Sequence, residues 1–112
     1  MKNWSFLLLF LVVAYFSAAQ SDLASITIKT SSQCEMCKKR IEKGMRLQKG
    51  VKSAELNLEN HTLTVVYNPR KSTPQKIKVA LTKIGYDADD MLADPKAYNR
   101  LPDCCKKNNH KQ

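Results

Sequence analysis

The sequence predicts an α+β domain in which two helices cover one face of a four-stranded antiparallel sheet. Two observations predict it: apolar residues alternate with polar ones in several short segments, and they recur at helical spacing in two longer ones. The order is strand, helix, strand, strand, helix, strand, over residues 25–30, 35–48, 51–59, 62–67, 74–84 and 86–92. This is the order of the ferredoxin-like βαββαβ sandwich.

The first strand and the first helix flank a pair of cysteines. Residues 25–30 alternate apolar and polar side chains, as a half-buried strand does. In the helix over residues 35–48, Ile41 and Met45 share the inner face, whereas lysine and arginine cover much of the rest. Gly50 ends this helix, because glycine readily adopts the left-handed conformation that caps one.

Two strands that form a hairpin follow. Leucines alternate with polar residues over residues 51–59, and apolar side chains share one face over residues 62–67. Because only Asn60 and His61 separate the segments, the strands are expected to pair. We expect this turn to lie far from the cysteines, so His61 is a weak candidate for a metal ligand, as is His110 in the polar tail.

The second helix has a defined beginning and end. Thr73 is the predicted N-cap, and Pro74 takes the first helical position, where a missing N–H does no harm. Gly85 ends the helix. Residues 86–92 then predict a short fourth strand, weak because it contains three aspartates.

A C-terminal extension, residues 93–112, follows this domain. Asp94 and Pro95 have the pattern of another N-cap and first helical residue, so one further short helix is expected. The chain then reaches the adjacent Cys104 and Cys105 before a polar end, which predicts disorder.

Residues 1–19 have the layout of a secretory signal peptide. Lys2 supplies the positive charge, residues 6–16 are apolar almost throughout, and the small residues at 17–19 form a cleavage site. The apolar run is shorter than the roughly 20 residues of a membrane helix, although an uncleaved anchor is the alternative. The chain thus divides into a signal peptide, a domain and an extension, at 1–19, 20–92 and 93–112, and a periplasmic or secreted protein is expected.

The four cysteines form two close pairs, Cys34 with Cys37 and Cys104 with Cys105. Exported domains usually place four cysteines in two disulfides, but neighbours in sequence rarely bond to each other because a disulfide needs a wider Cα separation. A single bridge between the pairs remains open. Cys34 and Cys37 stand at a helix N-terminus, whose free N–H groups favour thiolate over thiol. Thiolates bind soft metals or exchange disulfides, and both chemistries are open.

The extension is long enough to return to the first pair. About eleven residues link the domain to Cys104, which span at most about 40 Å, or about 25 Å with a short helix. A six-residue strand spans about 20 Å. Cys104 and Cys105 could therefore join Cys34 and Cys37, and three or four sulfurs would favour zinc or a Cu(I) cluster. A separate low-affinity thiol site and intermolecular bridging are the alternatives.

Three segments match one family pattern. They are Cys34-x-x-Cys37-x-x-x-Ile41-Glu42, Gly50-Val51 and Ile84-Gly85-Tyr86. Over residues 23–92 the chain resembles the heavy-metal-associated domain, a family that includes copper chaperones, the N-terminal modules of copper-transporting ATPases and the periplasmic mercury-binding protein. The resemblance implies the ferredoxin-like fold and binding of a soft metal by Cys34 and Cys37.

Three positions near the cysteines need separate treatment, because one differs from the family pattern and two could have a role at the metal. The family often carries Gly-Met-Thr before the first cysteine, and its methionine stiffens the loop; here Ser32 takes that place. Met36 stands between the cysteines and is expected to be an exposed loop residue. Tyr86 matches a position that lies beside the metal in many bacterial members, and a core aromatic role is the alternative.

The number of ligands points to the metal. Two thiolates satisfy Cu(I) or Hg(II), which accept near-linear coordination, whereas structural zinc prefers four ligands. The sequence therefore predicts an exported protein that carries or scavenges metal on Cys34 and Cys37, Cu(I) first, with Hg(II) or Zn(II) as alternatives. An incoming thiol would take the metal by ligand exchange, so the expected partner is a metal donor or acceptor such as a metal-transporting ATPase.

Other partners follow from the formal net charge of +9. This charge favours an acidic partner or peripheral contact with a membrane surface, whereas export and the lack of an aromatic-lined basic sheet argue against nucleic acid. We expect a monomer, with a metal-bridged dimer as the alternative. No nucleophile–base arrangement or phosphate loop is visible, so no enzyme activity is expected.

The alternative function is that of a thiol–disulfide oxidoreductase acting through Cys34 and Cys37. That class also places Cys-x-x-Cys at a helix N-terminus. Its thioredoxin architecture, however, needs parallel strands and a cis-proline that faces the dithiol, and no proline of this chain falls in a suitable strand.

Overall fold

The computed structural model of the protein describes residues 22–107. The elements are β1 (Ala24–Lys29), α2 (Glu35–Arg46), β2 (Val51–Asn57), β3 (Thr62–Tyr67), α3 (Pro74–Ile84), α4 (Pro95–Asn99) and a 3₁₀ turn, η1 (Asp103–Cys105). The predicted signal peptide and His110 lie outside the described residues. Within residues 22–107, no helix is long and apolar enough to cross a membrane.

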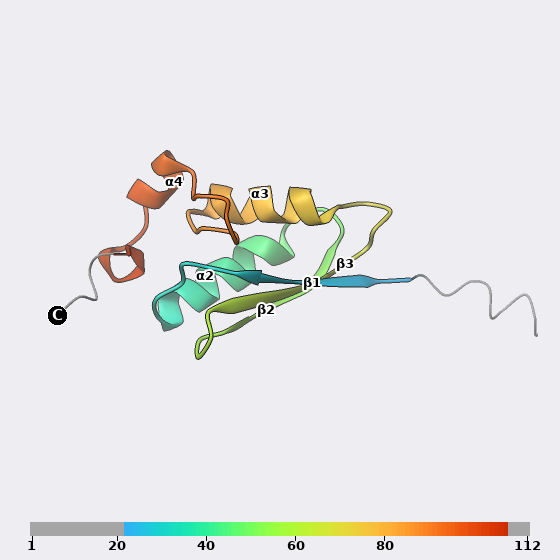
Figure 1. Ribbon diagram of the computed structural model, residues 1–112, viewed down its shortest axis with the longest axis horizontal. Helices are drawn as coiled ribbons and strands as arrows, with labels where there is room; N and C mark the ends of the chain where they lie inside the picture. Colours follow the sequence, from blue (N-terminus) through green and yellow to red (C-terminus); the bar gives the residue numbers. More distant parts are fainter. Residues whose placement is uncertain (1–21, 108–112) are drawn as a thin grey trace, which may run out of the picture.

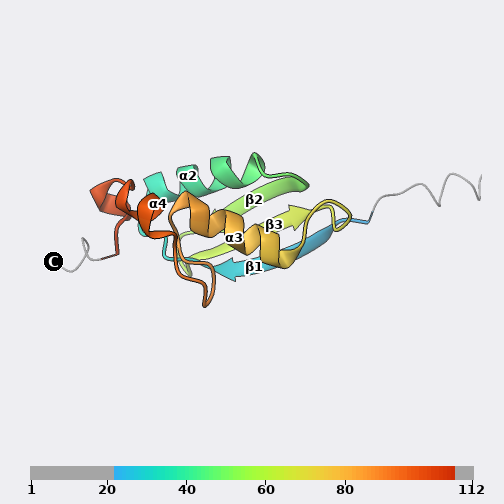
Figure 2. The same cartoon turned by 90° about the horizontal axis from the view of Figure 1, so that it is seen from above.

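The molecule has two layers, as predicted. The strands form an antiparallel sheet in the order β1-β3-β2, and α2 and α3 lie side by side on one of its faces (Figures 1 and 2). Apolar side chains fill the space between the layers, among them Ile28, Ile41, Met45, Leu56, Leu63, Val65, Ile77 and Leu81. Removing each such side chain from water stabilises the fold by about 1.5–3 kcal/mol.

The helix ends follow the predicted residues closely. The Thr73 hydroxyl accepts a hydrogen bond from the Lys76 N–H (3.1 Å), and Pro74 is the first residue of α3. Gly85 ends α3 with φ 120°. The helix predicted over residues 35–48 ends at Arg46, because the N–H of Gln48 closes a tighter turn on the Met45 carbonyl.

The β2–β3 hairpin lies at the same end of the sheet as the loop that carries Cys34. Both β1 and β2 pair antiparallel with β3, so they run in the same direction and their C-terminal ends lie at the same end of the sheet. The Thr30 N–H donates to the His61 carbonyl (2.9 Å), and the Ser32 hydroxyl lies 3.5 Å from Nδ1 of His61. The expectation that His61 lies far from Cys34 is therefore wrong, because it overlooked this shared strand direction.

The predicted fourth strand is reduced to a single bridge in the described part of the chain. Ala88 forms one bridge with Thr30 at the end of β1, where a fourth strand would start. It forms a second bridge with Met91, three residues further along the same segment. Two hydrogen bonds between Ala88 and Met91, each 2.9 Å, close a tight turn over Asp89 and Asp90. Asp89 adopts φ 54°, a conformation that aspartate tolerates better than most residues do.

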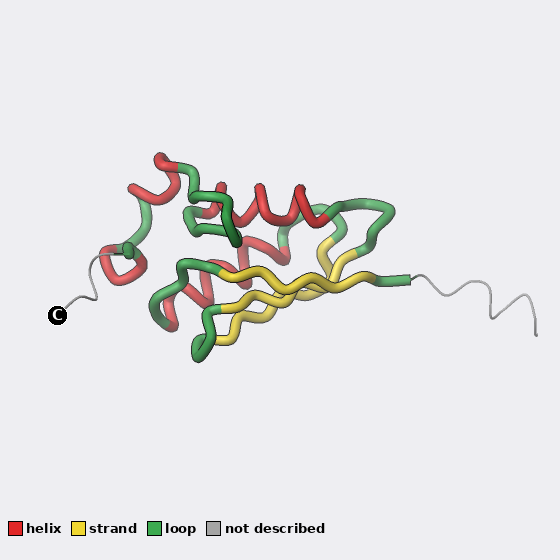
Figure 3. The backbone as a smooth tube through the Cα atoms, in the orientation of Figure 1, coloured by secondary structure: helices red, strands yellow, loops and turns green. Residues whose placement is uncertain are grey.

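The turn sends the chain back along α3 toward the cysteine-bearing loop (Figure 3). The N–H of Asp94 donates to the Thr82 carbonyl (3.0 Å), and the Asp94 carboxylate accepts from the Ala97 N–H (3.1 Å), which confirms the predicted N-cap of α4. After α4, the turn η1 therefore lies beside the start of α2 (Figure 1).

Asp89 fastens the turn to β1, and its replacement should destabilise the fold. Its Oδ1 accepts a hydrogen bond from the Lys29 N–H (2.9 Å). Asp89→Ala should lower the free energy of unfolding by about 2 kcal/mol, because alanine loses this bond and tolerates positive φ poorly. Asp89→Asn is the matched control, since asparagine keeps the acceptor and the conformation. Urea unfolding at pH 7 measures both, and equal losses would contradict the role of the hydrogen bond.

The same contribution should depend on pH. The N–H of Lys29 lowers the pKa of Asp89, burial opposes this, and Lys78, whose Nζ lies 3.1 Å away, lowers it further. A carboxyl with a lowered pKa stabilises the fold above its ordinary value, here 3.8, and loses that contribution as the pH falls through the lowered value. The stability gap between wild type and Asp89→Ala should thus narrow below about pH 4. Solvent screening keeps the contribution of the ion pair with Lys78 to the free energy of unfolding small.

Candidate metal centre

Cys34 and Cys37 stand at the start of α2. Cys34 is the N-cap residue, with an extended backbone (φ −149°, ψ 174°) and a half-buried side chain. Cys37 lies in the first turn and faces the core, with none of its surface exposed. Since side chains three residues apart share one side of a helix, the two Sγ atoms lie 3.2 Å apart.

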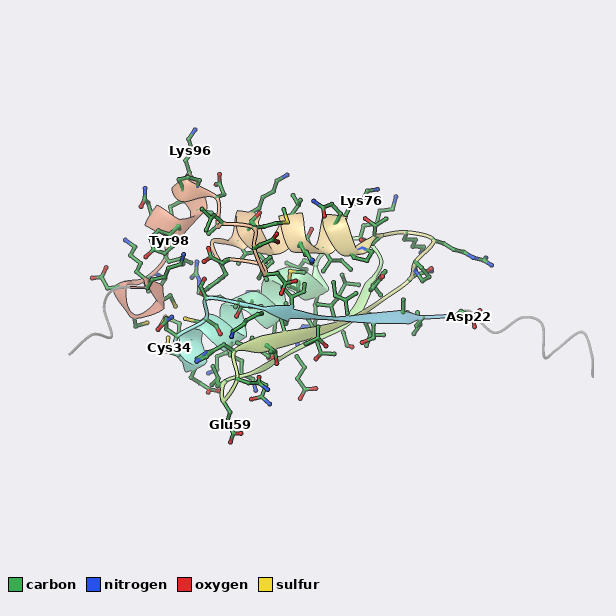
Figure 4. All side chains as sticks on the ribbon, viewed as in Figure 1. Asp22, Cys34, Glu59, Lys76, Lys96 and Tyr98 are labelled. Atoms are coloured by element: carbon green, nitrogen blue, oxygen red, sulfur yellow. The ribbon has the colours of Figure 1, made fainter. Side chains whose placement is uncertain are left out.

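The extension brings Cys104 and Cys105 to the same place, the end of the molecule where Figure 4 labels Cys34. Sγ of Cys104 lies 3.5 Å and Sγ of Cys105 3.8 Å from that of Cys34. The Cys37 and Cys105 sulfurs are 2.7 Å apart, and those of Cys104 and Cys105 are 3.9 Å apart. The structure thus brings together all four predicted ligand candidates, and no disulfide joins these described cysteines.

Three contacts hold the extension in this position. Leu101 is buried and meets Gly85, where a Cβ atom would come within 3.0 Å of its Cδ2. The N–H of Lys107 donates to the Tyr98 hydroxyl (2.9 Å), and its ammonium pairs with Asp87. Leu101 and the Lys107 ammonium therefore hold the extension against the domain, the bond to Tyr98 links two of its own segments, and Cys105 is buried.

Three of the thiols have shifted pKa values. Burial opposes ionisation of Cys34, but the N–H and thiol of Cys37, and then the thiols of Cys104 and Cys105, lower its pKa from 9.0 to about 7. The hydrogen bond with Cys34 raises the pKa of Cys104. Burial, followed by the thiol of Cys37, raises the pKa of Cys105. Of these three thiols, Cys34 at the rim is therefore the one that ionises most readily.

Tyr86 closes the inner side of the cluster. Its ring is buried, and its hydroxyl has no hydrogen-bond partner among the described residues. Burial raises the pKa of Tyr86 most, and the neighbouring Cys105 and Cys37 raise it further. Tyr86 is thus both a core aromatic and a neighbour of the sulfurs, so the two roles expected from the sequence coincide.

Two residues of the surroundings were not assigned a role from the sequence. Ser32 is buried, and its hydroxyl accepts a hydrogen bond from the Thr30 hydroxyl (2.9 Å) and lies beside His61. This network anchors the loop at the position where the family often has methionine. Met36 is exposed, as expected, but it lies in the first turn of α2 and not in a loop. Its Sδ lies 3.9 Å from Sγ of Cys104, a contact that only knowledge of the docked extension could have predicted.

The donor set fits a soft metal ion. Among residues 22–107, the ligand atoms of Cys34, Cys104 and Cys105 form a group within 4.8 Å of one another, and Cys37 adjoins two of them. Thiolate sulfurs select ions such as Cu(I) and Zn(II) over hard cations. His61 bonds the loop rather than the cluster.

The comparisons with known proteins agree with this chemistry. Residues 33–87 match the heavy-metal-associated domain. The chain is 39% identical over 54 residues to the copper chaperone CopZ of Staphylococcus epidermidis, a match that covers 48% of this chain and 79% of the chaperone. The chain therefore belongs to the heavy-metal-associated domain family, as the resemblance of its three motif segments predicted.

Solved structures support the ferredoxin-like fold. A CopZ metallochaperone is 30% identical with a TM-score of 0.55, over 58% of this chain and 98% of that one. Oxidized MerP from Ralstonia metallidurans CH34 is 20% identical with a TM-score of 0.58, over 61% and 96%, which shows a shared fold. The chain spans 7% and 5% of two copper ATPases that it also matches, from Bacillus subtilis and Rattus norvegicus.

Replacing Tyr86 with phenylalanine should separate its two roles. An unpaired buried hydroxyl costs about 1–3 kcal/mol, so Tyr86→Phe should leave the metal-free protein as stable or raise its free energy of unfolding by about 1 kcal/mol. Metal binding should stabilise Tyr86→Phe less than it stabilises wild type, because in the variant a thiolate loses the hydrogen bond that the Tyr86 hydroxyl would donate. Thermal unfolding with and without one equivalent of metal measures both; a metal-free variant that is clearly destabilised would contradict this assignment.

Proposed function

We propose that the protein is an exported carrier or scavenger of a soft metal ion, Cu(I) first, with Hg(II) or Zn(II) as alternatives. One observation carries the proposal: Cys34 and Cys37 hold their sulfurs 3.2 Å apart at the start of α2 in a heavy-metal-associated domain. Two thiolates suffice for a near-linear Cu(I) or Hg(II) ion. Membership of this family supports metal binding and transfer as the function.

Transfer would proceed by exchange of thiolate ligands. Cys34 lies at the half-exposed rim and Cys37 inside the fold, so an incoming thiol reaches the ion from the side of Cys34. The ion can gain the partner's sulfur before it loses one of its own, and therefore passes on without ever being left bare. Such a carrier forms and breaks no bond in a substrate other than these metal–sulfur bonds, and we propose no enzyme activity.

The proposed partner is a metal-transporting ATPase or another thiol-bearing metal protein. The copper chaperone and the copper ATPases among its relatives support this choice. The net charge of +9 favours an acidic partner surface or a peripheral encounter with an anionic membrane. We place the protein in the periplasm or outside the cell, on the basis of the signal-peptide pattern in residues 1–19.

The alternative of a thiol–disulfide oxidoreductase has less support. The strands described here form an antiparallel sheet, and the peptide bonds of the described residues include no cis-proline. A measurement of insulin reduction discriminates between the two functions, because an oxidoreductase would catalyse it and a metal carrier would not.

Cu(I) titration of the reduced chain under anaerobic conditions tests the proposal. We expect one Cu(I) bound per chain, more tightly than by glutathione, and loss of this binding in Cys34→Ser and in Cys37→Ser. Thr64→Ser, an exposed hydroxyl-conserving change on β3, is the control and should bind as wild type does. Competition against a chromophoric Cu(I) chelator gives the affinities. Wild-type affinity no higher than that of glutathione would overturn the proposal.

A further inference from the structure

We infer that Cys104 and Cys105 complete, with Cys34 and Cys37, a four-thiolate site for a divalent d¹⁰ cation such as Zn(II) or Cd(II). The inference rests on the proposed metal-binding function and deepens it. It assigns ligand roles to two cysteines that lie outside residues 33–87, the part of the chain that matches the family.

The spacing of the sulfurs suits tetrahedral coordination. Zn–S bonds of about 2.3 Å place the sulfurs of a tetrahedral site about 3.8 Å apart, and a linear ion with such bonds would separate its two sulfurs by about 4.6 Å. The contacts of Cys34 with Cys104 and Cys105 are 3.5 and 3.8 Å, and Cys104 and Cys105 are 3.9 Å apart. The Cys37–Cys105 pair, at 2.7 Å, and the Cys34–Cys37 pair, at 3.2 Å, must open by about 1 Å and about 0.6 Å to admit the ion.

The charge of the cation matters because two of the sulfurs are buried. Neither Cys37 nor Cys105 exposes more than 1% of its surface. Four thiolates around a divalent ion carry a net charge of −2, and around a monovalent ion −3, a difference that is costly where water is excluded. The full set of sulfurs therefore favours a divalent ion, whereas Cu(I) needs only the pair at the start of α2.

A second observation points to a ligand inside the cluster. The Tyr86 hydroxyl is fully buried and has no partner among the described residues, and its neighbours are Cys37 and Cys105. Nearly all buried polar groups are hydrogen-bonded in folded proteins. A metal-bound thiolate is a strong acceptor, so a loaded site would supply the partner that this hydroxyl lacks.

The extension acts as a clasp over such an ion. Leu101 packs on Gly85, and Tyr98 and Asp87 bind the two ends of Lys107, which lies just past Cys105. These contacts fix the second pair of sulfurs without involving the first. A divalent ion would use all four sulfurs as ligands, whereas Cu(I) would leave two of them uncoordinated.

Metal titration of the purified, fully reduced chain tests the inference. Zn(II) and Cd(II) should bind one per chain with four sulfur ligands by X-ray absorption, and Cys104→Ser/Cys105→Ser should retain two. The affinity of the double variant should fall more than about 100-fold, beyond the usual cost of losing an outer-shell partner. Lys106→Ser, in the same segment, is the control and should match wild type.

The Cu(I) arm of the same titration distinguishes the two proposals. Equal Zn(II) affinity and two sulfur ligands in wild type and double variant, with Cu(I) still bound, would overturn the four-thiolate site alone. Tetrathiolate Zn(II) without Cu(I) binding would support the site and contradict Cu(I) as the cargo. Failure to bind any of these ions would overturn both.

A second pair of variants leaves every thiol in place. Leu101→Ala removes the packing that docks the extension and should weaken Zn(II) binding at least about tenfold, with Cu(I) affinity unchanged. Leu92→Ala makes the same change at an exposed position and should have no effect. Urea unfolding confirms that both variants fold, and unaltered Zn(II) affinity in folded Leu101→Ala would contradict the clasp.

Discussion

The reversal of the chain after Ala88 is the constraint on which the sulfur cluster depends. A full fourth strand would have carried the chain along β1, away from Cys34. Instead two hydrogen bonds between Ala88 and Met91 close a turn, and Asp89 ties that turn to Lys29 at the end of β1. The residues that a fourth strand would have used form the connection to α4 instead. The chain after α4 then brings Cys104 and Cys105 to Cys34 and Cys37.

Local sequence signals predicted most of the fold. Thr73, Gly85 and Asp94 act through hydrogen bonds and dihedral angles that lie within a few residues of themselves, so the helix ends they predict are confirmed. The prediction of a fourth strand is wrong because that strand depends on contacts between segments distant in sequence. Its length depends on whether the ladder with β1 outweighs a two-residue turn of aspartates, and Asp89, with its side chain bonded to Lys29, favours the turn.

The site was predictable in part. The Cys34–Cys37 pair follows from helical geometry alone. The place of His61 follows from strand directions: β1 and β2 run the same way, so the turn after β2 lies beside the loop after β1, and the expectation that it lies far from Cys34 is wrong for this reason. For Cys105, the length of the chain showed only that it could reach the dithiol. Its burial depends on the packing of Leu101 against Gly85, a contact between residues distant in sequence. Tertiary packing of this kind leaves no local pattern.

The two pairs of cysteines place opposite demands on one protein. A carrier needs an ion that stays under-coordinated, so that a partner's thiol can add before another leaves. A closed tetrahedral site withdraws the ion from that exchange. The structure separates these demands in space: Cys34 and Cys37 belong to the rigid start of α2, whereas Cys104 and Cys105 belong to an extension held by a few contacts at Leu101 and Lys107.

In the proposed site the two pairs of cysteines belong to different segments, α2 and η1, so its affinity for an ion and its rate of release would be set by different residues. The packing of the extension determines how long a divalent ion is held, and the geometry of α2 determines whether any soft ion is captured. An ion that needs only two sulfurs gains little from the clasp and is handed on readily. One that needs four is retained until the extension lifts, so coordination number alone would divide metals between transfer and sequestration.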